Sequence, residues 1–484
     1  MRKDENFNAF VRVFAIVLIM ILVGGCISTQ KQENNLEVKT SIDVGTKIAS
    51  ARNAYYVSSA GLDENNGSKD KPWKTINYGL SKISAGSQLV IEQGTYNEAL
   101  ELTNSGTKEN PIVIIGNGKV VIDGTNTGGD GLILRPGISN VEINNIKMTN
   151  LKNNWALSLY GGNDNIRIEN VEIEKADTGI HLTVGESGKK PQFGSVTNLV
   201  MNNLYIHDNA VGGIDCTPGP CIGLTLTNSL LEKNGISSEG NFGADGFAVE
   251  VGDNILLDNV TSRNNGGDGV DIGSRTPIFS QKSADVSVAN SEIYRNGLNG
   301  LKLWNGGKVV NTLVKSNGIA GLALIYNARY EVVNSLIAGN GIEGRDYGSI
   351  IGYDEPVALG KNDNLQVYFF NNIVYKNSPG TDQTGIYLGK GVSFYSDYNI
   401  WFSRDDEEIF EEKTQRSYAN GERLGNNDKN SIYTDPNLDS SFIPKQNSNV
   451  LDAGTNSFNG INAPGKDIKG NMRNKVDIGP YEIN

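Results

Sequence analysis

The sequence predicts an all-β protein that folds as a right-handed parallel β-helix, a solenoid, with a short helix at its N-terminal end. Two short strand patterns alternate along the chain and recur every 21 to 38 residues. No segment with the period of a helix separates them in the middle of the chain. Repeats of this length indicate stacked structural units that share one continuous core.

The first pattern begins with Asn, usually followed by a small or apolar residue, a variable one and an apolar one. Asn tolerates a positive φ angle and is common in turns. We therefore expect the Asn side chains to stack as a ladder at one turn of successive coils. The copies begin at Asn145, Asn170, Asn203, Asn228, Asn259, Asn290, Asn311, Asn334 and Asn372.

The second pattern is a Gly followed by alternating residues, with apolar side chains at the first and third positions. Alternation with a period of two predicts a half-buried strand whose second position after Gly faces outward. Short turns must join these parallel strands, and we expect the longer coils to carry loops at 185–197, 217–222, 236–244 and 274–283. The copies begin at Gly179, Gly213, Gly246, Gly269, Gly300 and Gly321.

Residues 51–130 differ from the repeats and are predicted to form an N-terminal cap with the first coils. Ile76, Leu80 and Ile83 have the spacing of a helix face. A short helix here would cover the exposed edge of the first coil. The parallel β-helix itself is expected over residues 131–402.

Residues 403–484 are predicted to form a C-terminal segment and cap. The charged stretch 403–430 is expected to be a loop or an added hairpin. The closing stretch from Asp467 to Glu482 is expected to cap the second end of the solenoid.

The N-terminus has the pattern of a secretory leader. Arg2 and Lys3 precede the apolar run Val13–Val23, which ends in small residues before Cys26. A Cys in this position resembles the lipidation site of prokaryotic lipoproteins, so residues 1–26 are interpreted as a signal peptide and 27–50 as a polar tether. The alternative is an uncleaved membrane anchor, although eleven apolar residues are short for about 30 Å of hydrocarbon.

These features predict an extracellular, cell-surface protein that a lipid on Cys26 holds at a membrane. The formal charge of −12 argues against nucleic acid as a partner. It also disfavours a polyanionic sugar unless a cation mediates the contact. We expect a monomer.

Stacked coils place chemistry-bearing residues in columns. The outward position of the second pattern reads His181, Asp215, Ala248, Asp271, Lys302 and Ala323 along the chain. The position before Gly adds Asp245 and Asp268. Because adjacent coils lie about 4.8 Å apart, we expect Asp245, Asp268, Asp271 and Lys302 to converge on one face.

Three close carboxylates repel one another, and a bound Ca²⁺ would relieve this. The alternative is a salt bridge from Lys302 to Asp271, with the other two Asp side chains capping turns. Spacing alone leaves both interpretations open.

The stretches Ala244–Ala248, Gly267–Asp271 and Asn299–Leu303 resemble the core motifs of polysaccharide lyase family nine, which includes pectate lyases. The resemblance implies that Asp245, Asp268 and Asp271 bind Ca²⁺ and that Lys302 is the catalytic base. Gly267 and Val270 depart from the family pattern, which has Asp and Trp there. The opening segment Tyr55–Ile91 also looks like the family's N-terminal cap.

The function predicted on this basis is calcium-dependent cleavage of an acidic polysaccharide, a pectate-like polyuronate, by β-elimination with a lysine base. The competing class is a non-catalytic glycan-binding or adhesin β-helix on the cell surface. A glycosidase is a weaker third option, because it would need two acids about 5–10 Å apart and no lysine.

Further residues are candidates for contact with substrate. Arg275 and Arg295 could grip carboxylates, although single surface charges are usually only solvated. His181 and Asp215 continue the outward column and could line a groove. Trp304 could stack on a sugar, or it could pack in the core or at the rim. Cys216 and Cys221 could form a local disulfide or remain buried thiols.

Overall fold

The structure is a computed structural model. It describes residues 53–182, 194–236, 244–273, 285–325, 328–341, 350–351, 365–377, 386–389, 392–402, 407–411, 416–419 and 428–483. The predicted leader with Cys26, the tether and Arg275 lie outside the described residues. Within the described parts of the chain, no helix is long and apolar enough to cross a membrane.

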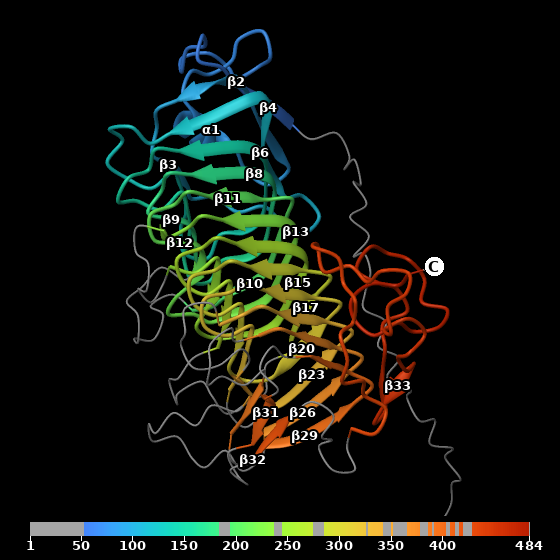
Figure 1. The fold of residues 1–484 in the computed structure, drawn as a ribbon. Coiled ribbons are helices and arrows are strands. Elements are labelled where there is room, and N and C mark those ends of the chain that lie inside the picture. Colours follow the sequence, from blue (N-terminus) through green and yellow to red (C-terminus); the bar gives the residue numbers. More distant parts are fainter. Residues whose placement is uncertain are drawn as a thin grey trace, which may run out of the picture. The chain divides into compact units, whose positions relative to one another are not determined.

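Two large sheets account for most of the strands (Figure 1). The first contains β1 (Asn53–Val57), β2 (Ser87–Tyr96), β4 (Ile112–Asp123), β6 (Ser139–Thr149), β8 (Asp164–Glu174), β10 (Val196–Asn202), β11 (Tyr205–His207), β13 (Cys221–Glu232), β15 (Gly252–Arg263), β17 (Val286–Ala289), β18 (Glu292–Tyr294), β20 (Gly307–Val310), β21 (Leu313–Lys315), β23 (Arg329–Val333), β24 (Leu336–Ala338), β26 (Leu365–Phe370), β27 (Ile373–Tyr375), β29 (Val392–Asp397) and β30 (Ile400–Phe402).

The second sheet contains β3 (Leu100–Leu102), β5 (Leu132–Leu134), β7 (Leu157–Leu159), β9 (Thr178–Leu182), β12 (Gly212–Cys216), β14 (Phe247–Val249), β16 (Val270–Ile272), β19 (Leu301–Leu303), β22 (Leu322–Leu324), β25 (Ile350–Ile351), β28 (Ile386–Leu388), β31 (Glu407–Glu411) and β32 (Arg416–Ala419). A separate antiparallel pair joins β33 (Ser457–Phe458) to β34 (Ile461–Asn462).

The chain visits the two sheets in turn, and its strands pair in parallel from coil to coil. For example, β13 pairs with β15, and β14 pairs with β16. Alternate side chains point inward, as in the buried–intermediate–buried pattern of β14, β16 and β19. These side chains form a continuous apolar core along the stack, which confirms the predicted parallel β-helix.

The predicted Asn turn positions are present. From Asn145 to Asn334, every predicted position has a φ between 49° and 57°, whereas in the last copy Asn371 rather than Asn372 has the positive φ. Neighbouring side chains bond along parts of this outer Asn ladder. The Nδ2 of Asn203 donates to Oδ1 of Asn170 at 2.6 Å, and that of Asn259 donates to Oδ1 of Asn228 at 2.7 Å.

A second ladder, which the two repeat patterns do not indicate, lies inside the stack. Each Nδ2 donates to Oδ1 of the next member at 2.9–3.0 Å, and all members are buried. From the second member on, each Oδ1 also accepts the backbone N–H of the preceding member. The members of this inner Asn ladder are Asn209, Asn234, Asn265, Asn296, Asn317, Asn340 and Asn377.

The predicted helix is present as α1 (Ile76–Lys82). Thr75 caps it, because its hydroxyl accepts the backbone N–H of Tyr78. Ile76, Leu80 and the following Ile83 are buried in the core. The helix contacts β1, β2 and β3, so it covers the first coils as expected.

The C-terminal region holds one confirmed expectation and one correction. Within 403–430, β31 and β32 form an antiparallel hairpin that extends the second sheet. The stretch from Asp467 to Glu482 does not close the end of the stack. It lies along the side of three successive coils. Asn311 donates to the carbonyl of Lys466, Asn334 donates to the carbonyls of Asp477 and Gly479, and the carbonyl of Asn371 accepts the backbone N–H of Gly479.

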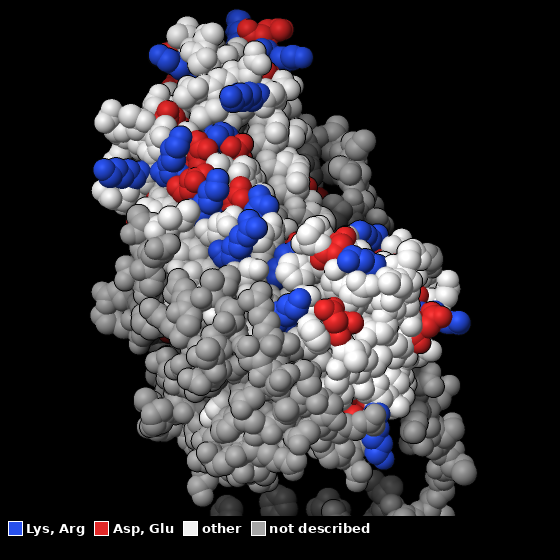
Figure 2. Space-filling model, in the orientation of Figure 1, with Lys and Arg blue, Asp and Glu red and all other residues white. Residues whose placement is uncertain are grey.

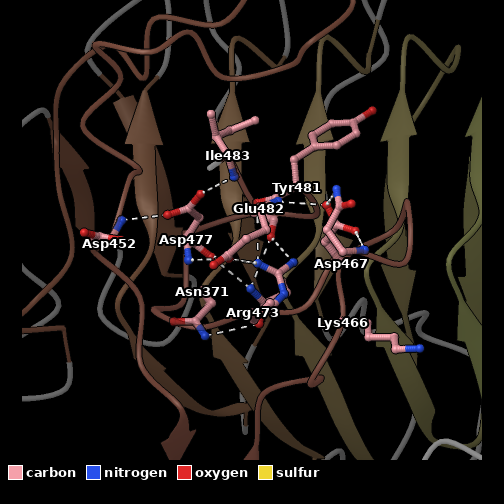
Figure 3. A network of polar contacts seen from close by, with 12 residues as sticks. Asn371, Asp452, Lys466, Asp467, Arg473, Asp477, Tyr481, Glu482 and Ile483 are labelled. Atoms are coloured by element: carbon pink, nitrogen blue, oxygen red, sulfur yellow. Dashed lines mark hydrogen bonds and ion pairs between the residues drawn. The ribbon is translucent and has the colours of Figure 1, made fainter.

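This placement has a physical reason. The outer Asn ladder leaves amide groups at the bends of these coils, and the C-terminal backbone supplies acceptors for them. A buried network around Arg473 completes the contact (Figure 3). Arg473 bonds Gly479 at 2.9 Å and Asn311 at 3.1 Å, and it pairs with Glu482 at 3.3 Å.

Candidate functional site

The register of the second sheet aligns the predicted outward column. His181 pairs with Asp215, Asp215 with Ala248, and Ala248 with Asp271. Asp271 then pairs with Lys302, and Lys302 with Ala323. The predicted convergence of residues far apart in sequence is therefore present in the fold.

Lys302 lies between two carboxylates. Its Nζ is 3.0 Å from Oδ2 of Asp271 and 3.2 Å from Oδ2 of Asp268. The ammonium also lies 4.8 Å from the ring centroid of Trp304, a distance at which a cation interacts with an aromatic face. Only 14% of the Lys302 side chain is exposed, so the group is held in a partly closed site.

Asp245 and Asp268 stand one coil apart, just before β14 and β16. Oδ1 of Asp245 accepts the backbone N–H of Asp268 at 2.6 Å. Oδ1 of Asp268 accepts the backbone and side-chain N–H groups of Asn299 at 2.7 and 2.8 Å. The two carboxylates thus hold three successive coils in register, which is the turn-capping role that the alternative interpretation requires.

The pKa shifts follow from burial and mutual repulsion. Burial, reinforced by Asp268 and Asp271, raises the pKa of Asp245 well above its usual range. Burial also raises the pKa of Asp271 to about 6, against the opposing effect of Lys302. For Lys302 itself, burial would lower the pKa, but the Asp268 and Asp271 carboxylates outweigh it and raise it. Lys302 is consequently protonated in this arrangement.

The donor chemistry suits a hard cation. Three carboxylates on adjacent coils face a single lysine, and oxygen donors are the ligands that Ca²⁺ prefers. The carboxylate oxygens of Asp245, Asp268 and Asp271 do not all lie within 4.8 Å of one another. The carboxylates would therefore have to move closer for one ion to touch all three.

The two departures from the family motif have distinct consequences. A Cβ atom on Gly267 would meet Oδ1 of Asp245 at 2.4 Å, so the Asp245 carboxylate occupies the space that a side chain there would need. Val270 is fully buried and packs in the core. The Val at this position, where the family pattern has Trp, therefore affects packing inside the coil and not the outer face.

The upstream part of the column forms a second polar group. His181 Nδ1 lies 3.1 Å from Oδ2 of Asp215, and the Trp155 ring stacks on His181 at 4.0 Å. His181 is only 6% exposed, so it is more enclosed than the predicted outward position implied. Trp155 closes over it from the preceding coil, and no signal in the repeat patterns had marked this residue.

Arg295 is not brought to this face. It follows β18 in the first sheet and lines a pocket with Lys315 and the C-terminal residues Phe442 and Tyr481. Arg295 therefore does not lie beside Lys302, because the turn between β18 and β19 separates the two sheets. Its contact with a substrate carboxylate stays a prediction. Arg275 lies outside the described residues.

Two further residues support the cluster. Trp304 donates its ring N–H to Oδ1 of Asp271 at 2.6 Å and is buried against Ala323 and Ile325. Trp304 therefore packs against neighbouring side chains, and its stacking on a sugar stays a prediction. Asn299 donates hydrogen bonds to Asp268, as described above. Its position directly before a repeat Gly, like that of Asp245 and Asp268, is the sequence signal that marks it. Cys216 and Cys221 form a disulfide beside Asp215.

The stacked coils and this column define a right-handed parallel β-helix. The chain belongs to the family described as "Pel9A-like, right handed beta helix region", whose pattern matches residues 55–346. This family assignment covers the coils that carry Asp245, Asp268, Asp271 and Lys302.

Individual proteins resemble this chain in sequence or in structure. The uncharacterized protein YwoF of Bacillus subtilis is 24% identical over 421 residues, which cover 79% of this chain and 87% of that protein. The crystal structure of pectate lyase Pel9A is 17% identical, with a TM-score of 0.53 over 90% of this chain and 98% of that one. The A-module of the Azotobacter vinelandii mannuronan C-5 epimerase AlgE6 is 16% identical, with a TM-score of 0.51 over 72% of this chain and 91% of that one.

Proposed function

We propose that this protein is a polysaccharide lyase that cleaves a polyuronate by β-elimination, with Lys302 as the base and Ca²⁺ held by Asp245, Asp268 and Asp271. The observation that carries the proposal is the position of Lys302 Nζ, 3.0 Å and 3.2 Å from two carboxylates on the outer face of the second sheet. Membership of the Pel9A-like family and the similarity to a pectate lyase structure support it.

The reaction requires the neutral amine of Lys302 to take the proton from the carbon next to the uronate carboxylate. The bond to the leaving sugar oxygen then breaks, a carbon–carbon double bond forms, and the leaving oxygen takes up a proton. When bound, Ca²⁺ would withdraw charge from the substrate carboxylate and so make the carbon proton more acidic. Asp215, whose side chain is 28% exposed upstream in the same column, would contact sugars further along the polymer, and the buried His181 would position it from 3.1 Å away.

The proposal also explains how Lys302 could lose its proton. The carboxylates of Asp268 and Asp271 keep it charged in the present arrangement. When these carboxylates engage a cation, their attraction for the ammonium weakens and the neutral amine becomes more accessible. Trp304 would meanwhile hold Asp271 through its 2.6 Å hydrogen bond.

The test is a panel of acidic polysaccharides incubated with Ca²⁺ or with chelator, read by the ultraviolet absorbance of the unsaturated product. Activity should require Ca²⁺ and should be lost in Lys302→Ala. The matched control is Lys308→Ala, since Lys308 lies on the first sheet and pairs with Glu331 at 3.8 Å. Full activity in Lys302→Ala would remove Lys302 from the mechanism.

A second candidate function is binding without catalysis, as a surface glycan-binding or adhesin protein. One observation favours it, namely that Lys302, Asp268 and Asp271 already satisfy one another as an ion-paired group. In that case a gel that contains acidic polysaccharide should retard the wild-type protein, and no unsaturated product should be released. Lys302→Ala should then weaken the fold rather than abolish a reaction.

We further propose, from the sequence of the leader, that Cys26 carries a lipid that holds the protein at the outer face of a membrane. Growth with a labelled fatty acid should label the wild-type protein. Cys26→Ser should remain unlabelled and appear in the medium. Equal labelling of both proteins would overturn the anchor.

A further inference from the structure

We propose that Glu172, Glu174 and His207 form a binding site for a divalent transition-metal ion of the zinc type. These residues lie on the first sheet, and Lys302 lies on the second. In the part of the chain that the structure describes, they are the one group of three such side chains whose ligand atoms all lie within 4.8 Å of one another. The inference is independent of the proposed lyase activity.

Strand geometry brings the three side chains together. Glu172 and Glu174 are two residues apart on β8 and therefore point to the same face. His207 on β11 pairs with Glu174 in the parallel register. The site is consequently held by strands of two adjacent coils, and Figure 2 shows acidic and basic side chains gathered over this part of the first sheet.

The orientation of His207 is that of a metal ligand. Its Nδ1 lies 2.6 Å from Oδ2 of Asp208, an acceptor that requires a proton on Nδ1, so the neutral imidazole has its lone pair on Nε2. The Tyr205 ring stacks on the imidazole at 3.8 Å and limits its rotation. A carboxylate behind the imidazole is the usual support for a histidine that binds a metal.

The free side of His207 faces the two glutamates. Nε2 is buried and makes no hydrogen bond, and the side chain as a whole is only 8% exposed. It lies 3.5 Å from Oε1 of Glu172 and 3.6 Å from Oε2 of Glu174. Ligand atoms about 2.0–2.2 Å from a tetrahedral zinc ion stand roughly 3.4 Å apart, so these spacings match a shared ion.

The same oxygens already hold a cation, the ammonium of Lys147. Its Nζ lies 2.7 Å from Oε1 of Glu172 and 3.2 Å from Oε2 of Glu174. The other oxygen of Glu174 is occupied by Thr149 at 3.0 Å and Lys175 at 3.3 Å, which leaves Oε2 for the site. A divalent ion would therefore replace Lys147, whose side chain is 24% exposed and has room to turn outward.

The donor set selects the class of ion. One imidazole nitrogen with two carboxylate oxygens suits zinc and its transition-metal neighbours, whereas Ca²⁺ prefers oxygen donors alone. A groove lined by Glu172 and Tyr205 opens beside the site and offers a path for the ion and for a water ligand.

The test uses the full chain with labelled histidine, because the chain has only two histidines. In excess Ca²⁺, which keeps the Asp245 cluster occupied, one equivalent of Zn²⁺ should shift the ring signals of His207 and leave those of His181 in place. His181 is the matched control, since its Nε2 is also buried and without a hydrogen bond. A shift of the His181 signals alone, or of neither set, would overturn the site.

Variants around the site should change zinc affinity in opposite directions. His207→Gln and Glu174→Gln should lower it at least about 100-fold, and Asp208→Asn by about 10–100-fold because it removes the support of the imidazole. Lys147→Gln should raise it, because the competing ammonium is gone. Weaker zinc binding in Lys147→Gln would show that Lys147 helps to build the site and would contradict the competition proposed here.

Discussion

At the scale of single residues, Asp428 shows how the fold controls the charge of a buried carboxylate. It is fully buried and accepts hydrogen bonds from Ser396, Ser431, Tyr433 and the Trp401 ring N–H. Burial raises its pKa, and the hydroxyl donors only partly offset this. The charged form is therefore less favourable in the folded protein than in the unfolded chain.

This shift predicts a pH dependence of stability. Because the pKa is higher in the folded state, the folded protein binds more protons at pH values above 3.8, the ordinary pKa of the group. As the pH rises from about 4, the free energy of unfolding of the wild type should fall relative to that of Asp428→Asn, which cannot ionise. Denaturant unfolding of both proteins across this range measures the difference, and a constant difference would contradict the shift.

Asp268 is the residue that most directly tests the calcium proposal. It contacts Lys302 with one oxygen and Asn299 with the other. Asp268→Asn keeps the size of the side chain and one oxygen but removes a negative charge, so calcium affinity should fall clearly in calorimetric titration. Asp253→Asn, on β15 of the first sheet, is the control and should bind calcium as the wild type does. Equal affinity in Asp268→Asn would exclude Asp268 as a ligand.

At the scale of elements, two Asn ladders hold the coils together in different surroundings. The outer Asn ladder supplies positive-φ residues at a bend, and its members from Asn145 to Asn259 are exposed, whereas Asn311 and Asn334 are buried. The inner Asn ladder is buried, and each of its amide oxygens accepts both a side-chain and a backbone N–H. Buried donors that lose their acceptor cost more free energy than exposed ones.

This difference predicts unequal effects of substitution. Asn296→Ala would leave the buried backbone N–H of Asn265 without its acceptor, and the side-chain amide of Asn265 would keep only Leu231 and Ser262. The free energy of unfolding should therefore fall by at least about 2 kcal/mol. Asn259→Gly keeps the positive φ and loses an exposed bond, so it should cost less than about 1 kcal/mol. Urea unfolding compares them, and equal losses would refute the distinction.

At the scale of the molecule, the C-terminal segment 428–483 fastens successive coils from the side. Arg473, with 1% of its side chain exposed, bonds Asn311 of the solenoid and the C-terminal Gly479 and Glu482 (Figure 3). Asp477 accepts the backbone N–H groups of Asp452 and Ile483 at 2.6 and 2.7 Å. These contacts couple the segment to the stability of the coils beneath it.

Removal of Arg473 should release this segment. Arg473→Met leaves the buried Glu482 carboxylate without its cation, a change that typically costs about 3–5 kcal/mol. Limited proteolysis should then cut within 428–483 much faster than in the wild type. Lys475→Met is the control, because Lys475 is 76% exposed and pairs with Asp452 at the surface, and its cleavage rate should remain unchanged.

Local patterns were enough to predict the fold and the column, but they failed where distant segments meet. The outward positions of Asp271 and Lys302 follow from alternation along single strands. Arg295 was expected beside them from nearness in sequence, yet one turn carries it to the other sheet. The burial of His181 depends on the Trp155 ring from another coil, which no pattern near His181 reveals.

By itself, the sequence determined the parallel β-helix, the capping helix and the residues that share a face. These features depend on the period of side chains along a strand and on turn residues, which are local properties. Only the tertiary structure decided that the C-terminal segment lies along the side of the stack, that a buried Asn ladder runs through it, and that His207 faces two glutamates. Those features arise from contacts between residues far apart in sequence, and no single repeat contains the information that brings such residues together.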